Sequence, residues 1–322
     1  MGDADGGGRW GCVRSAAWFA AEFGLDGPAH LVGPVDRGFQ GQVWRLTCGE
    51  RTYAVKEALV PLDHDQVVAA YALQQRAEEA GVVAPRQLLT VTGEPAVYVD
   101  GETLRVFDWL ELAPPDRDLD AIGLGRLLAR LHAVGGPTTG AVDQWFVEPV
   151  GRDHWVELVT ELRLAGAPFA ATLGALVDEL ATSETVMEAP RGVILCHRDL
   201  WADNVRAGAD GSPVVIDWDN CGPAPMAGEL AMVLVEFGST AARARDLYTA
   251  YVQAGGPARI TGRGDFSMPI AVLHHIVEIG ARQWLAASGD LARRRAAGRV
   301  TEFTDNPLLL ADIENLLAAV AD

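Results

Sequence analysis

The amino-acid sequence predicts an α+β fold with two lobes, a small β-rich N-terminal lobe and a mainly helical C-terminal lobe. Short strand-like segments separated by glycines dominate the chain up to about residue 112. The segment Ala113-Pro114-Pro115-Asp116 then interrupts regular structure, because two prolines remove backbone donors and fix φ. Beyond it, apolar residues recur at helical spacing. We therefore expect a domain boundary here, with lobes of residues 1–112 and 113–322.

The N-terminal lobe is expected to combine a meander of strands with two helices. Apolar side chains recur on one helical face over residues 10–25, and Gly27-Pro28 ends that helix. Residues 63–80 are helical by composition and stop at Gly81. Strands are predicted at 31–35, 41–47, 51–58, 87–92, 96–100 and 103–112.

The C-terminal lobe is predicted to be helical with one interruption. Two β-rich runs, 193–196 and 214–216, flank the polar loop HRDLWADN. Helices are expected at 119–133, 153–164, 169–180, 226–237, 240–254, 268–288 and 307–321.

Composition excludes several classes of partner. The chain carries 26 Lys and Arg against 44 Asp and Glu, a formal net charge of −18. Such a surface offers no basic stripe for phosphates, so we expect neither a nucleic-acid nor an anionic-membrane partner. The longest apolar run is far shorter than the roughly 20 residues of a membrane span. The four cysteines form no CxxC pair or zinc spacing, so reduced thiols in a cytoplasmic protein are expected. The sequence does not indicate an oligomeric state.

Lysine usage singles out one residue. Of the 26 basic residues, 25 are Arg, and Lys56 is the only Lys. It lies in the strand-like segment RTYAVKEA, after a turn that contains Gly38 and Gly41. A compact ammonium there suits nucleotide phosphates, and Arg is not equivalent to it.

The loop after residue 196 carries the strongest chemical pattern. It contains His197-Arg198-Asp199, Asn204 follows five residues after Asp199, and a second apolar run ends at Asp217. Phosphoryl transfer needs one carboxylate to orient an acceptor hydroxyl, and an amide and a second carboxylate as ligands of Mg²⁺. Taken alone, Asp199 and Asn204 are more typical of turns or helix caps and Asp217 of the end of a strand, but the combined order favours this chemistry. His197 is interpreted as a residue that shapes the loop.

These residues, together with the segments AVKEA, WLEL, GRLLARLHA, CHRDLWADN and VIDWDN, resemble the aminoglycoside phosphotransferase and choline kinase family, small-molecule kinases with a protein-kinase-like fold. The resemblance covers nearly the whole chain. It implies that Asp199 is the catalytic base, that Asn204 and Asp217 bind Mg²⁺, and that Lys56 contacts the phosphates of ATP. The hinge at residues 107–111, with Phe107 and Trp109, would then contact adenine.

The chain departs from the family pattern at two places. Asp36 stands where the first glycine of the glycine-rich loop GxGxxGxV would be, although Gly38, Gly41 and Val43 match the rest. Many family members also have a glutamate that pairs with the lysine from the following helix. The corresponding residue here is Ala70, so a different placement of Lys56 is expected.

The acceptor is expected to bind between the catalytic loop and the C-terminal helices. Trp201 offers an aromatic face two residues after Asp199, which suits a sugar ring or an ammonium group. A packing role for this tryptophan is equally consistent with the sequence. The other candidates for contact with the acceptor are Asp219, His274, Glu278 and Trp284.

The sequence therefore predicts a kinase that uses ATP and Mg²⁺ and phosphorylates a hydroxyl of a small amino-bearing molecule, such as an aminoglycoside or aminosugar. Three alternatives stay open. They are a protein kinase, a metabolic kinase for homoserine, choline, fructosamine or a sugar, and a nucleotide-binding regulator that has lost catalysis. The segment IDWD in place of DFG argues against the first.

Overall fold

The computed structural model describes residues 14–38 and 41–321 and divides into two compact units. The first unit runs to Pro114 and also contains Arg206–Cys221. The second comprises Pro115–Val205 and the chain from Gly222 onwards. The segment with Asp217 thus groups with the strands, whereas the sequence placed it with the helices. The functional division into a nucleotide-binding and an acceptor-binding lobe stays a prediction.

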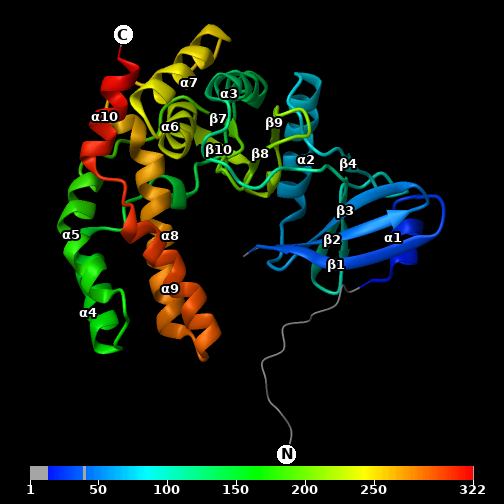
Figure 1. The fold of residues 1–322 in the computed structure, drawn as a ribbon, viewed down its shortest axis with the longest axis horizontal. Coiled ribbons are helices and arrows are strands. Elements are labelled where there is room, and N and C mark those ends of the chain that lie inside the picture. Colours follow the sequence, from blue (N-terminus) through cyan, green and yellow to red (C-terminus); the bar gives the residue numbers. More distant parts are fainter. Residues whose placement is uncertain (1–13, 39–40, 322) are drawn as a thin grey trace, which may run out of the picture. The chain divides into compact units, whose positions relative to one another are not determined.

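The first unit is built on an antiparallel sheet (Figure 1). The strand order is β1-β2-β3-β6-β4, and β5 also pairs with β6. The strands are β1 (Ala29–Arg37), β2 (Gly41–Cys48), β3 (Arg51–Ala58), β4 (Gln87–Leu88), β5 (Val97–Val99) and β6 (Glu102–Asp108). The first unit also contains the helices α1 (Ala16–Glu22) and α2 (His64–Glu79) and the short helix η2 (Trp218–Asn220). It further contains the hairpin of β8 (Val205–Ala207) and β9 (Pro213–Val215), apart from Val205, which belongs to the second unit.

One face of this sheet is apolar and the other carries charge. Val55 on β3 lies opposite Val106 on β6, and both are buried in a cluster with Phe19 of α1. Because side chains alternate along a strand, the next pair, Lys56 and Arg105, points to the other face. The register of two central strands therefore sets two cations side by side.

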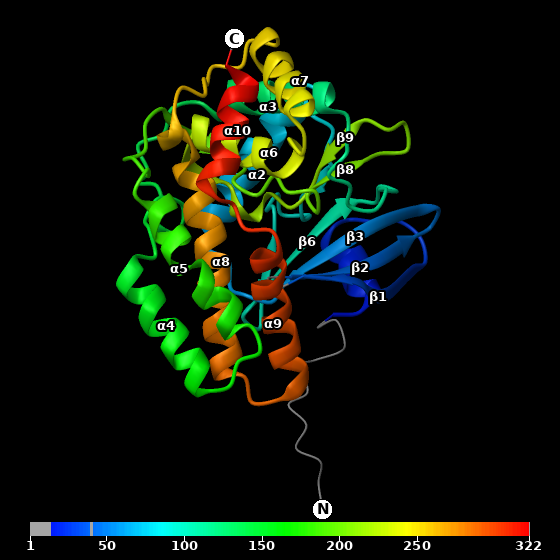
Figure 2. The same ribbon diagram turned by 60° about the vertical axis from the view of Figure 1, so that its left-hand side comes forward.

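The second unit is mainly helical, with one two-stranded sheet of β7 (Val193–Cys196) and β10 (Gly222–Pro225). Helices α8 and α9 lie side by side in both views, and α4 and α5 lie next to α8 (Figures 1 and 2). The α-helices are α3 (Ala121–Gly135), α4 (Arg152–Leu164), α5 (Ala170–Glu184), α6 (Met226–Phe237), α7 (Ala241–Gln253), α8 (Ser267–Ala286), α9 (Asp290–Asp305) and α10 (Leu310–Val320), and the short helices are η1 (Gln144–Phe146) and η3 (Arg263–Phe266).

The structure confirms the predicted α+β class. Part of the predicted N-terminal helix falls on residues 1–13, outside the described residues. The predicted strand at 87–92 is wrong in length, since β4 has only two residues. Helix α9 and strands β8 and β10 were not predicted. The segment of α9 contains Arg293-Arg294-Arg295 and buries only four residues, so its apolar period is weak.

Candidate active site

Lys56 on β3 is the cross-strand partner of Val43 on β2, and its side chain lies close to Gly41 of the same strand. A Cβ added at Gly41 would come within 3.4 Å of Lys56 Cε and 3.2 Å of the Glu57 carbonyl oxygen. A side chain at Gly41 would therefore crowd the Glu57 carbonyl oxygen and lie against the lysine side chain. Gly38 has more room, and its N–H donates to the Gly41 carbonyl with an N···O distance of 2.9 Å. Both predicted glycines thus belong to the β1–β2 connection, but only Gly41 needs to be small for packing reasons.

The ammonium of Lys56 is held by two carboxylates of the segment Asp217-Trp218-Asp219. Its Nζ bonds to Asp217 Oδ1 and lies 2.8 Å from Asp219 Oδ2. Asp217 follows β9 with a left-handed backbone, φ 59°, a conformation that costs a non-glycine residue about 1–3 kcal/mol. The Asp217 side chain is 36% exposed, whereas that of Asp219 is 5% exposed. The first carboxylate is therefore accessible and the second is enclosed.

Asp219 is also bound by Arg105 from β6. The two guanidinium nitrogens meet the two carboxylate oxygens, with 2.7 Å between Nη2 and Oδ2. Burial alone would raise the pKa of Asp219, but the charges and hydrogen bonds of Lys56 and Arg105 hold it well below its usual range. Asp219 was predicted to contact the acceptor, yet its carboxylate is already engaged by these two cations. Arg105 itself was not identified from the sequence, because nothing in its neighbourhood marks its partner 114 positions away.

The proposed catalytic loop, residues 197–204 of the second unit, brings Asp199 and Asn204 into contact. Asn204 Nδ2 donates to Asp199 Oδ2 at 2.9 Å and to the Asp199 carbonyl oxygen at 3.0 Å. The backbone N–H groups of Asn204 and Val205 both donate to the Trp201 carbonyl oxygen, at 2.9 and 2.8 Å, which closes the loop as a turn. Because the side-chain nitrogen Nδ2 of Asn204 donates to Asp199, the side-chain oxygen Oδ1 of Asn204 points away from Asp199. An amide oxygen is one of the hard oxygen donors that Mg²⁺ prefers.

A buried polar network holds this loop in place. The backbone N–H of Arg198, which is left-handed with φ 67°, donates to Glu229 Oε1 on α6. Glu229 Oε2 lies 3.0 Å from His132 Nε2, and His132 Nδ1 lies 2.8 Å from the Tyr251 hydroxyl. Burial raises the pKa of Glu229, but the hydrogen bonds from His132 and Arg198 outweigh burial and lower it. Glu229 and His132 were missed as site residues, although an acid inside the apolar segment MAGELAMVLV is an unusual choice that marks a buried partner.

His132, Cys196 and Glu229 offer ligand atoms within 4.8 Å of one another, as a metal site would. Both His132 nitrogens and both Glu229 oxygens already have partners, and the Cys196 thiol donates to the Ala224 carbonyl oxygen. We therefore interpret this cluster as a structural network and not as a metal centre.

The predicted hinge follows β6. Phe107 is still within the strand, opposite Ala54 and Gln87. Trp109 donates its backbone N–H to the Thr52 carbonyl oxygen at 3.2 Å, and the guanidinium of Arg45 lies 4.9 Å from its ring centroid. The backbone N–H of Trp109 is thus bonded to Thr52 within the first unit, and the ring of Trp109 packs against the guanidinium of Arg45.

The predicted acceptor residues of the second unit differ in accessibility. Trp201 and Glu278 are partly exposed. Trp284 is buried in the core between α4, α5, α8 and α9. His274 is 1% exposed, and its Nδ1 bonds to Glu184 at 2.7 Å. Burial therefore leaves His274 and Trp284 as core residues rather than surfaces for a ligand.

Glu278 does not pair with His274, its neighbour one turn away on α8. It bonds instead to His154 on α4, with 2.7 Å between Oε1 and Nε2, and to His275. The ring of His275 stacks on Trp145 with 5.1 Å between centroids. These groups form a partly exposed polar and aromatic patch on the α4 and α8 side of the second unit.

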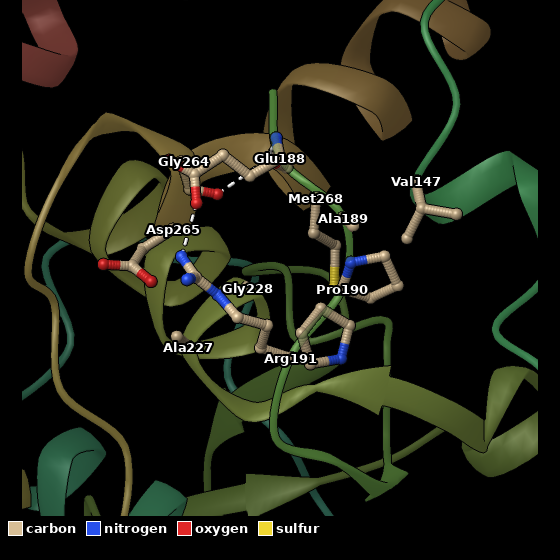
Figure 3. A pocket seen from close by; sticks show the side chains of 12 residues that line it. Val147, Glu188, Ala189, Pro190, Arg191, Ala227, Gly228, Gly264, Asp265 and Met268 are labelled. Atoms are coloured by element: carbon tan, nitrogen blue, oxygen red, sulfur yellow. Dashed lines mark hydrogen bonds and ion pairs between the residues drawn. The ribbon is translucent and has the colours of Figure 1, made fainter. Parts of the chain in front are cut away.

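A shallow hollow of the second unit is lined in part by the segment that precedes β7 in the chain (Figure 3). It is lined by the segment Glu188–Arg191, by the start of α6 and by residues around Gly264. Arg191 crosses it to pair with Glu188, and both side chains are exposed. Because exposed ion pairs contribute little and no proposed reactive group lies here, this hollow is not part of the candidate site.

Comparisons with known proteins show the family and the fold of the chain. The sequence matches the model of the phosphotransferase enzyme family over residues 32–265. No curated protein sequence matches the chain. Within the residues that the structure describes, no helix is long and apolar enough to cross a membrane.

Several solved structures resemble the structure of this chain. A spectinomycin phosphotransferase in complex with ADP and spectinomycin has a TM-score of 0.70 and 16% identity, over 94% of this chain and 97% of its own. An aminoglycoside phosphotransferase from Alicyclobacillus acidocaldarius has a TM-score of 0.59 and 19% identity, over 88% of this chain and 91% of its own. A microcompartment-associated aminopropanol kinase has a TM-score of 0.57 and 15% identity, over 92% of this chain and 96% of its own. At these identities the likeness shows the kinase-like fold.

Proposed function

Because the chain belongs to the phosphotransferase enzyme family and is a small-molecule kinase, we propose that it transfers the γ-phosphoryl group of ATP to a hydroxyl of a small amino-bearing molecule, with Mg²⁺ as cofactor. An aminoglycoside or an aminosugar is the acceptor class that we favour. The observation that carries the proposal is the contact of the only lysine, Lys56, with the carboxylate of Asp217. A lysine and an acid at these two motif positions are the pair that phosphoryl transfer requires.

Different residues of the chain neutralise the charge of the phosphates and accept the proton of the acceptor hydroxyl. Lys56 neutralises charge on the nucleotide phosphates, and Gly41 leaves room for it. Asp199 orients the acceptor hydroxyl and accepts its proton, and Asn204 fixes the Asp199 carboxylate through the bond at 2.9 Å. Asn204 and Asp217 would hold Mg²⁺, which would supply charge neutralisation at the phosphates when bound.

Adenine recognition is proposed for the hinge, with Phe107 and Trp109. Since the Trp109 N–H is already donated to Thr52, the adenine contact falls to the remaining backbone groups up to Glu111 and to the Trp109 ring. The similarity to a phosphotransferase solved with ADP supports a nucleotide as the donor.

Two features favour an amino-bearing acceptor. The formal net charge of −18 steers cations towards the protein. Trp201 and Glu278, the accessible members of the predicted acceptor set, offer a π face and a carboxylate to an ammonium group. The likeness to structures of a spectinomycin phosphotransferase and an aminopropanol kinase is consistent with this class.

A metabolic amino-alcohol kinase is the second candidate, favoured by the likeness to the aminopropanol kinase. The same experiment separates the two. The chain is incubated with ATP, Mg²⁺ and a panel of aminoglycosides, aminosugars and simple amino alcohols, and each acceptor is examined by mass spectrometry for the gain of one phosphate. Asp199→Asn serves as the matched control. If ATP binds but no hydroxyl on the panel is phosphorylated, the proposed acceptor class is wrong.

A further inference from the structure

Two like charges lie next to each other on the charged face of the first unit's sheet. Lys56 on β3 and Arg105 on β6 are direct cross-strand partners. Like charges at such positions repel, the more so when burial removes water. Here the two side chains are only 14% and 3% exposed. A buried carboxylate between them is therefore needed to keep both cations in place.

Asp219 is that carboxylate. Its Oδ2 lies 2.7 Å from Arg105 Nη2 and 2.8 Å from Lys56 Nζ, so a single oxygen bridges the two cations. Its backbone carbonyl accepts a hydrogen bond from Gln66 Nε2 of α2 at 2.8 Å. Both the backbone and the side chain of Asp219 are thus fixed by other parts of the first unit.

Asp217 also contacts Lys56, but it differs from Asp219 in its exposure and its proposed role. Its side chain is much more exposed, and we have assigned its carboxylate to Mg²⁺. A carboxylate that binds a metal attracts an ammonium group less strongly, because the metal neutralises part of its charge. Asp219, paired with Arg105 away from solvent, is the carboxylate that stays available to Lys56.

The residues of α2 that face the Arg105–Asp219 pair include no acid. A small hollow is lined by Leu62, Gln66, Val67, Ala70, Arg105 and Asp219, among which Asp219 is the only acidic residue. Ala70 on α2 therefore faces the same space as the Arg105–Asp219 pair, with only a methyl group.

We propose that Asp219, held by Arg105, is the positioning residue that directs Lys56 towards the nucleotide phosphates. The proposal rests on the proposed kinase function. It assigns Asp219 to the nucleotide side of the reaction and not to the acceptor or to the metal. Asp219 does not touch the reacting atoms but acts through Lys56.

The test compares binding of ATP and ADP to the wild-type chain and to Asp219→Asn by calorimetry, in EDTA and in Mg²⁺. Asparagine keeps the shape but removes the charge that holds Lys56. Loss of a hydrogen bond to a charged group is expected to weaken ATP binding about 10- to 100-fold, in EDTA as well as in Mg²⁺. Melting temperatures of both proteins verify that the variant is folded.

A conservative variant separates positioning from a merely structural role. Asp219→Glu keeps the carboxylate on a side chain one methylene longer, and Asp219→Gln is the uncharged control of equal size. We expect ATP to bind Asp219→Glu about tenfold or more tightly than Asp219→Gln, because only the carboxylate attracts the Lys56 ammonium. Equal affinity of the two variants would show that side-chain shape, not charge, matters at this position, and would overturn the proposal.

Two other results also count against it. Wild-type affinity in Asp219→Asn would overturn the proposal, and so would a loss that appears only with Mg²⁺, since Asp219 would then act through the metal. If Asp219→Asn does not fold, Arg105→Lys is tested instead, since it keeps the positive charge but loses the bidentate contact with Asp219. Unchanged ATP binding in that variant would also overturn the proposal. A wild-type chain that binds no ATP would instead contradict the proposed function itself.

Discussion

The side-chain amide of Asn204 donates to the carboxylate of Asp199, with 2.9 Å between Nδ2 and Oδ2. Asn204 thereby orients the carboxylate of Asp199, and the side-chain amide oxygen of Asn204 points away from that carboxylate. A proposed base and a proposed metal ligand are thus coupled within six residues of chain. The first prediction concerns this pair.

Asp199→Asn is expected to lower the rate of phosphoryl transfer by about 10²–10⁴-fold, because an amide cannot accept the proton of the acceptor hydroxyl. Affinity for ATP should stay within about twofold of wild type, since the substitution leaves the first unit untouched. Single-turnover kinetics and calorimetry measure the two quantities. An unchanged rate would remove Asp199 from the role of base.

Asp217→Ala is expected to abolish the dependence of nucleotide affinity on Mg²⁺. In the wild type, Mg²⁺ should tighten ATP binding, and the accessible carboxylate of Asp217 is the proposed ligand. In the variant, Lys56 keeps its contact with Asp219 at 2.8 Å, so binding in EDTA should fall much less. Titration of ATP at increasing Mg²⁺ distinguishes these effects, and an identical Mg²⁺ dependence in both proteins would refute the assignment.

Lys56→Arg is expected to fail as a replacement although the charge is kept. The planar guanidinium is larger than an ammonium, and the position is enclosed by Gly41 and by the Arg105–Asp219 pair. We expect kcat/KM for ATP to fall about tenfold or more. A chain that otherwise uses Arg at all basic positions makes this a direct test of why one Lys is present. Wild-type activity in the variant would make the lone lysine an accident of composition.

Glu229→Gln is expected to destabilise the fold by about 1–3 kcal/mol at pH 7, because glutamine cannot accept from both the Arg198 N–H and His132. The pKa of Glu229 is lowered in the folded state, so its contribution is present above the unfolded pKa of about 4.3 and is lost as the pH falls below it. The gap in free energy of unfolding between the two proteins should therefore narrow on acidification. Denaturant melts at pH 7 and below pH 4 measure this gap, and a gap that widens at low pH would contradict the argument.

The fold could be predicted where the sequence carries a local pattern. Glycine-bounded strands and amphipathic helices gave the α+β class and most elements, whereas α9 was missed because its arginine-rich segment has only a narrow apolar face. Residues of the site with a fixed order along the chain, such as Asp199, Asn204 and Asp217, could be named as candidates. Arg105 could not be named, because its role depends on a partner 114 residues away that only the tertiary structure brings to it.

His274 illustrates the same limit and provides the last prediction. An isolated histidine on an amphipathic helix is compatible with a ligand site or with the core, and the sequence alone does not separate them. In the structure its Nδ1 bonds to Glu184, which also accepts from Trp155 Nε1 at 3.1 Å and from the Gly151 N–H at 2.9 Å. Burial alone would raise the pKa of Glu184, but the hydrogen bonds from His274 and Trp155 outweigh burial and lower it below its ordinary value. The carboxylate is therefore charged at neutral pH.

His274→Ala is therefore expected to lower stability, because it leaves this charge with one donor fewer and opens a cavity beside Trp155 and Phe303. A loss of about 2–4 kcal/mol is expected, measured as the free energy of unfolding in denaturant. Affinity for the acceptor, once one is identified, should not change in the folded fraction. Glu278→Gln, on the partly exposed side of the same helix, is the matched comparison, with little effect on stability and a raised KM for an amino-bearing acceptor. The reverse pattern, a stable His274→Ala with a raised KM, would return His274 to the acceptor site.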